Sequence, residues 1–147
     1  MYLRQILPWD WDTDTQISNS TLMLLADHFN QTSFRYRSSH RSAKRQYLLD
    51  VNPWCRESDH GGGLNVIDAR WIDTQNGLYI DITGLRETSS EPNIWECKNF
   101  HKYKVNDLYP LRMTVFEGVR ANVPFRYDSI LLDEYTPYAL TKTTFNK

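Results

Sequence analysis

Two strand-like runs joined by a short polar segment constrain the fold of this 147-residue chain more than any other feature. The runs cover residues 66–73 and 78–85, and residues 74–77 between them read Thr-Gln-Asn-Gly. Asn-Gly favours the positive backbone angles of a tight turn between antiparallel strands. The sequence therefore predicts a β-hairpin.

The register of this hairpin decides which side chains meet. If the Asn-Gly pair forms a two-residue turn, Ile72 lies opposite Asp81, and Arg70 lies diagonal to Asp81 on the same face. Asp68 would follow on that face, because side chains alternate along a strand. The pattern predicts one polar face that carries both acidic and basic groups.

Other segments predict a small mixed sheet with flanking helices. Ser18 is a candidate N-cap, and the basic stretch Arg35–Arg45 is typical of a solvated loop. The remaining expected elements are a strand over residues 8–17, a helix over 18–30, a strand over 47–51, a hairpin with arms at 113–116 and 119–123, and a helix over 127–135. We expect one α+β domain over residues 1–147.

Charge and composition exclude some classes of partner. A net charge of −1 argues against a dedicated nucleic-acid or membrane-surface binder. No apolar run reaches about 18 residues, so the sequence predicts no membrane-spanning helix within it. Two N-glycosylation sequons begin at Asn19 and Asn30, and either could be used in a secretory lumen.

Asp12 and Asp14 are the first candidate site residues. Two positions apart on a strand, their carboxylates would project from one face about 6–7 Å apart. Two negative charges placed in this way repel each other, and a cation between them removes the repulsion. Mg²⁺ favours carboxylates together with phosphate oxygens as its ligands. A third carboxylate, Asp81, could complete a two-metal clamp. The alternative is that these aspartates are turn and cap residues on a wet surface.

Three further residues are candidates for binding phosphate. His60 precedes three glycines whose backbone N–H groups could cradle a phosphate, although a flexible connection would have the same composition. Arg70 and Arg112 could each grip phosphate oxygens through a guanidinium, or could be surface arginines with local ion pairs.

The two cysteines leave three alternatives. Cys55, His60, Cys97 and His101 could together ligate Zn²⁺. Cys55 and Cys97 could instead form a disulfide in an oxidising compartment, or remain two separate buried thiols.

Several motifs resemble one family. The sequence LPWDWDTDTQ (residues 7–16) resembles the "PWDDDxD" signature of the LicD/fukutin family, which belongs to the nucleotidyltransferase superfamily. Residues 60–85 are similar to the fungal mannosylphosphate-transfer proteins of that family. Three further segments resemble the C-terminal half of the family. They are WECKNFHKY (residues 95–103), DLYPLRMTVFEG (107–118) and VPFRYDSILLDEY (123–135).

The resemblance implies an enzyme with a nucleotidyltransferase-like fold. It would use Mg²⁺ or Mn²⁺ to transfer a phosphosugar or similar group from a nucleotide-linked donor to a glycan acceptor, in protein mannosylphosphorylation. Asp12 and Asp14 match the family's metal-binding pair, and Asp81 matches its later strand carboxylate. Another glycosyltransferase subunit is a further expected partner, and the setting implied is the Golgi or secretory-pathway lumen.

Two departures from the family pattern leave other functions open. Trp11 stands where many relatives have Asp, and the family's upstream helix and glycine motif would lie before Met1. We therefore expect a chain truncated at both ends, without the membrane anchor of the full-length protein and catalytically silent alone. The alternative functions are a non-catalytic regulatory partner of a mannosylphosphate transferase, as some fungal relatives are described, and a simple glycan-binding module.

Overall fold

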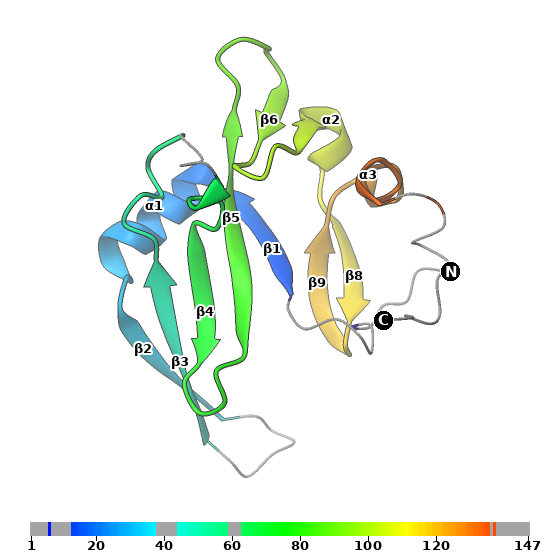
Figure 1. The fold of residues 1–147 in the computed structure, drawn as a ribbon. Helices are drawn as coiled ribbons and strands as arrows, with labels where there is room; N and C mark the ends of the chain where they lie inside the picture. The colour runs from blue at the N-terminus through cyan, green and yellow to red at the C-terminus, as the bar shows by residue number, and fades with distance from the viewer. Residues whose placement is uncertain (1–5, 7–12, 38–43, 59–62, 136, 138–147) are drawn as a thin grey trace, which may run out of the picture. The chain divides into compact units, whose positions relative to one another are not determined.

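The computed structural model describes residues 6, 13–37, 44–58, 63–135 and 137 (Figure 1). Contacts divide the chain into two compact units. The sheet unit comprises Asp12–Arg86 and Cys97–Phe100, and the hairpin unit comprises Met1–Trp11, Glu87–Glu96 and His101–Lys147. Strands predominate and helices are short, so the expected α+β class is confirmed.

The sheet unit is one mixed sheet with a helix on one face (Figure 1). Strands β2, β3, β4 and β5 are antiparallel neighbours in that order, and β1 pairs in parallel with β5. The elements are β1 (Asp14–Ser18), α1 (Asn19–His28), β2 (Thr32–Arg37), β3 (Lys44–Val51), β4 (Ala69–Asp73) and β5 (Tyr79–Glu87).

The predicted hairpin is confirmed, since β4 and β5 pair antiparallel across residues 74–77. Its predicted register is wrong by two residues. Arg70 lies directly opposite Asp81, and Ile72 lies opposite Tyr79. A shift of two residues keeps every side chain on the predicted face, because the period of a strand is two.

The register differs because the turn contains four residues instead of two. The Asp73 N–H donates to the Leu78 carbonyl at 2.8 Å, and the Asp73 carboxylate accepts from the Gln75 N–H at 2.9 Å. The Gln75 N–H, with Arg45 as a further partner, lowers the pKa of the Asp73 carboxyl. The Asn76 side-chain oxygen accepts a further hydrogen bond, from the Leu78 N–H. These side-chain bonds stabilise the wider turn.

Helix α1 begins at the predicted N-cap, Ser18, and ends at His28. The Ser18 hydroxyl accepts from the Thr21 N–H at 3.2 Å, which caps the first turn. The apolar stripe faces the sheet, with Leu22 fully buried and Leu25 and Ala26 half-buried. Packing of this stripe holds the helix, because a helix of ten residues is marginal alone.

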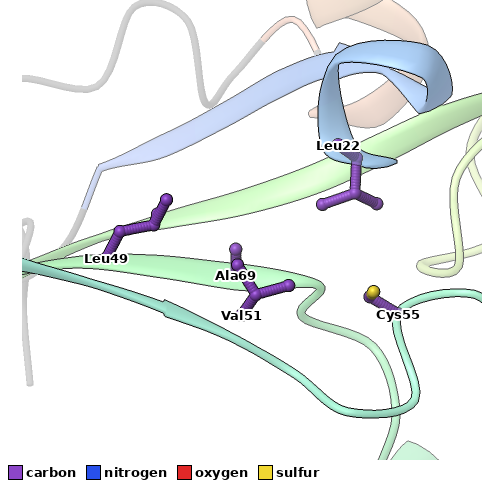
Figure 2. Packing of buried hydrophobic residues seen from close by; sticks show 5 residues of the cluster. All are labelled: Leu22, Leu49, Val51, Cys55 and Ala69. Atoms are coloured by element: carbon purple, nitrogen blue, oxygen red, sulfur yellow. The ribbon is translucent and has the colours of Figure 1, made fainter. Parts of the chain in front are cut away.

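The core lies between α1 and the sheet (Figure 2). Its buried side chains point toward one another from the helix, two strands and the segment after β3; they are Leu22, Leu49, Val51, Cys55 and Ala69. Burying a leucine side chain stabilises the fold by about 1.5–3 kcal/mol.

A buried ion pair adjoins this core. Asp68 is 0% exposed, and Lys98 Nζ lies 2.8 Å from its Oδ1. The other carboxylate oxygen accepts from the Gly84 N–H at 2.8 Å. Asp68 was expected on the face of Asp81. Strand β4 instead begins at Ala69, so Asp68 lies just before the strand. Its carboxylate accepts from the Gly84 N–H and lies close to the core.

The basic stretch Arg35–Arg45 was expected to be a loop, and the prediction is wrong for its two ends. Residues 35–37 belong to β2 and residues 44–45 to β3, and the two strands pair antiparallel. Phe34 packs against Trp71 with ring centroids 5.1 Å apart, which anchors β2 through the face opposite its arginines.

The hairpin unit contains short elements only. It comprises β6 (Ile94–Glu96), β7 (Lys102–Lys104), α2 (Val105–Leu108), β8 (Arg112–Phe116), β9 (Val119–Val123) and α3 (Tyr127–Glu134). The predicted β8–β9 hairpin and α3 are confirmed. Among the residues described in either unit, no helix is long and apolar enough to cross a membrane.

Gly84 provides a test of this packing. A Cβ at that position would lie 2.7 Å from Leu22 Cδ2 and 3.3 Å from Asp68 Oδ2. We expect Gly84→Ala to lower the free energy of unfolding by about 1–3 kcal/mol, measured by urea denaturation. In a Leu22→Ala background the added methyl group has space, so its cost should fall clearly. Equal costs in the two backgrounds would contradict this contact.

Candidate functional site

Four charged residues form a row across the sheet, at the level of Asp81. Asp50 on β3 is the register partner of Arg70 on β4, which is the partner of Asp81 on β5. Asp81 is in turn the partner of Asp14 on β1. Register partners on adjacent strands project from the same face of a sheet. We call these four residues the charged row.

The alternation of side chains explains why the row faces away from α1. Ile80 and Ile82 line the side of the sheet that packs toward the helix, so Asp81 between them projects from the other side. Thr15 pairs with Ile82 and shares its side, which leaves Asp14 beside Asp81. The apolar residues that build the core thus also direct the carboxylates outward.

Arg70 is the cation of the row and is held from two sides. Its Nε donates to Asp81 Oδ1 at 2.7 Å, and its guanidinium lies 4.6 Å from the centre of the Tyr79 ring. The hydrogen bond that Arg70 donates to Asp81 is the main reason that the pKa of Arg70 is raised above its ordinary value, and the charge of Asp50 contributes. The guanidinium therefore remains charged at every pH at which the protein is folded.

Burial differs between the two members of this ion pair. The Arg70 side chain is 45% exposed, whereas that of Asp81 is only 9% exposed. Asp14 and Asp50 are both exposed. Solvent therefore reaches the outer edge of the guanidinium and the two outer carboxylates more readily than it reaches Asp81.

The predicted acidic residues are brought together in part. Asp14 and Asp81, which are distant in sequence, are register partners on adjacent strands. Asp12 lies outside the described residues. The metal expectation that rests on the three carboxylates stays a prediction, although the part of the chain that is described contains no group of three or more His, Cys, Asp or Glu side chains placed to hold a metal.

The predicted phosphate-binding residues have three different placements. Arg70 pairs directly with Asp81. Arg112 belongs to the hairpin unit, where its guanidinium lies 4.7 Å from the centre of the Phe125 ring. His60 lies outside the described residues. A shared phosphate site formed by these three residues stays a prediction.

Cys55 and Cys97 are both buried, and they form no disulfide with each other. The disulfide alternative is therefore not what the structure contains, whereas the zinc alternative needs His60, which lies outside the described residues, and stays a prediction. Burial raises the pKa of Cys55, and the negative charge of Asp68 raises it further, so this group is a neutral thiol at neutral pH. Gln16 Nε2 lies 3.8 Å from Cys97 Sγ.

An open cavity of about 400 Å³ lies on the face that carries α1. Its lining is almost entirely apolar and consists of Thr15, Leu25, Phe29, Phe34, Leu49, Trp71, Ile80 and Ile82. A nucleotide phosphate needs charged or N–H donor groups around it. This cavity therefore does not suit the phosphates of a nucleotide donor.

Sequence reasoning did not anticipate the role of Lys98. This lysine is 3% exposed, and its Nζ also donates to the Trp54 carbonyl at 2.9 Å and to Asn65 Oδ1 at 3.1 Å. Lysine is rarely buried, and a single residue outside a helix or strand has no periodicity to reveal its surroundings. Its partners Asp68, Trp54 and Asn65, all distant in sequence, explain its position.

Comparison with known proteins gives the functional context. No family model matches the chain. It is 42% identical over 90 residues to Mannosyltransferase regulator 4 of Saccharomyces cerevisiae, a match that covers 61% of this chain and 8% of that protein. It is 43% identical over 82 residues to Mannosyltransferase regulator 14 of the same organism, covering 56% of this chain and 9% of that protein. The chain thus spans less than a tenth of either relative.

These relatives support the fungal side of the resemblance and correct the expected activity. They place the similarity among proteins concerned with mannosyltransferases. The resemblance led us to expect an enzyme, a LicD-type transferase with Asp12, Asp14 and Asp81 as catalytic residues. That assignment of an enzyme is wrong, because both relatives are named regulators, which points to a non-catalytic role. A resemblance of motifs to a family of transferases does not by itself carry the chemistry of that family.

Replacement of Lys98 tests the buried ion pair. Lys98→Met would leave the Asp68 carboxylate buried without its closest cation, and we expect a loss of about 3–5 kcal/mol in the free energy of unfolding, measured by chemical denaturation. Lys102→Met is the matched control, because its ion pair with Glu91 is about half exposed and should be worth less than about 1 kcal/mol. Similar small losses in the two variants would contradict the structural role of Lys98.

Proposed function

We propose that this chain is a non-catalytic regulatory segment that binds a mannosyltransferase. The observation that carries the proposal is the identity of 42–43% with two mannosyltransferase regulators, over more than half of the chain. The proposed process is protein glycosylation, and more narrowly the addition of mannosylphosphate to glycans. In that process the transferase would bind the donor and the acceptor glycan, and this chain would act through contact with the transferase.

The geometry of the sheet unit supports binding over chemistry. One carboxylate oxygen of Asp81 is already engaged by Arg70, and the described cavity is apolar. Transfer from a nucleotide donor depends on charge neutralisation at the phosphates, which neither feature supplies.

A binding assay with an Asp14 variant separates the regulator from an enzyme. The chain, immobilised, is expected to bind the mannosyltransferase of its own cell and to change its rate of transfer. Asp14→Asn removes one charge from an exposed position while it keeps the side-chain shape. Binding measured by biolayer interferometry should therefore change by less than about twofold, within the usual effect of a surface substitution.

Two results with the same protein preparations would contradict the proposal. Turnover of a nucleotide-linked mannose donor by the chain without any transferase, abolished by Asp14→Asn, would restore an enzyme. Absence of binding to the transferase, with a chain shown to be folded by circular dichroism, would contradict the regulatory function.

The location that we propose is the lumen of the Golgi or another part of the secretory pathway. Asn30 supports it, because this sequon residue is exposed and its side-chain oxygen accepts from the Val51 N–H at 2.9 Å. That bond leaves Nδ2, the atom that carries an N-glycan, without a hydrogen bond to the described residues. Asn19 is half-buried instead, and its side-chain oxygen accepts from Arg86 Nε at 3.1 Å.

Glycosidase digestion tests this location. The protein isolated from its own cells is expected to lose mass on treatment with an N-glycosidase, and Thr32→Ala, which removes the Asn30 sequon, should abolish most of that loss. Thr32→Ser keeps the sequon and is the matched control. A protein without any N-glycan at Asn30 would count against a lumenal location.

A further inference from the structure

The charged row contains three carboxylates and one guanidinium. Asp14, Asp50 and Asp81 occupy positions on three strands, and Arg70 lies between Asp50 and Asp81. Carboxylates this close repel one another unless a cation is near. The residue that supplies the positive charge therefore determines what else the row can bind.

A divalent cation was expected beside Asp14 and Asp81, and the described residues do not fit it. Mg²⁺ requires near-octahedral oxygen ligands at about 2.0–2.1 Å and keeps several waters. Asp81 has little room for such a shell, because its side chain is 9% exposed and its Oδ1 accepts from Arg70 Nε at 2.7 Å. A dication at Asp81 would also be repelled by the adjacent guanidinium.

Arg70 is fixed where it is by more than one contact. It lies on β4, an internal strand of the sheet, with acidic register partners on both neighbouring strands. The Tyr79 ring lies under its guanidinium at 4.6 Å, an arrangement that favours a cation over an aromatic face. A guanidinium cannot lose its charge at accessible pH, so this neutralisation is permanent.

From these contacts we propose that Arg70 is the resident cation of the charged row and takes the place that a divalent metal would need at Asp81. The row consequently binds neither Mg²⁺ nor Mn²⁺ through Asp81. Removal of the guanidinium uncovers the Asp81 carboxylate beside the exposed Asp14, and the two carboxylates then form a latent site for a divalent cation. The inference goes beyond the regulatory function and does not depend on it, because it concerns metal affinity and not binding to a transferase.

Titration with Mn²⁺ tests the inference on the intact chain. The free Mn²⁺ signal in electron paramagnetic resonance is followed for the unchanged chain and for Asp81→Asn. The two curves should coincide, since Asp81 is occupied by Arg70. Tighter Mn²⁺ binding by the unchanged chain than by Asp81→Asn would overturn the proposal. This comparison needs no variant of Arg70.

The Arg70→Gln variant tests the latent site. It keeps a polar side chain of similar reach and should bind Mn²⁺ at least about tenfold more tightly, the size of effect that groups adjacent to a metal ligand exert. Arg70→Gln combined with Asp81→Asn should lose that gain. Arg45→Gln is the matched control, because it breaks the ion pair with Asp73 outside the row and should leave Mn²⁺ affinity unchanged.

Each outcome of this series bears on the proposal. A gain that appears in Arg70→Gln and disappears in the double variant supports it. No gain in an Arg70→Gln chain whose circular dichroism matches that of the unchanged chain overturns it, as does an equal gain in Arg45→Gln. If Arg70→Gln does not fold, the comparison of the unchanged chain with Asp81→Asn decides alone.

Discussion

The buried ion pair between Asp68 and Lys98 connects parts of the sheet unit that are distant in sequence. Asp68 is positioned by the start of β4, and Lys98 arrives from a short segment that follows β6. Gly84 on β5 completes the contact through its N–H, where a larger residue would displace Leu22. A charge pair in such a place is costly to desolvate and strongly destabilising to break. Its value lies in fixing one arrangement of helix, strand and loop.

The sheet unit has two faces with different chemistry, both set by the same alternation of residues. One face carries α1, the core and an apolar cavity, and the other carries the charged row. On the second face, Arg70 pairs with Asp81 and so occupies one oxygen of that carboxylate.

Much of the local structure could be predicted from sequence, because periodicity and turn residues report on neighbours along the chain. The existence of the first hairpin, though not its register, was predicted correctly, as were α1 with its Ser18 cap and the β8–β9 hairpin. The sequence suggested that Asp14 and Asp81 lie close together, but it did not predict their parallel pairing, since that pairing joins strands that are distant in sequence. The burial of Lys98 had no local signal at all, because it depends entirely on tertiary contacts.

The four-residue turn after β4 determines which changes of length the hairpin can accept. Residues added there would lengthen the loop and leave the β4–β5 pairs in place, because β5 is also held by its pairing with β1. A slip of β5 along β4 by one residue would instead turn the strand over, placing carboxylates against α1 and isoleucines in water. The length of the turn can therefore vary among homologous chains, whereas the register between the two strands cannot shift by a single residue.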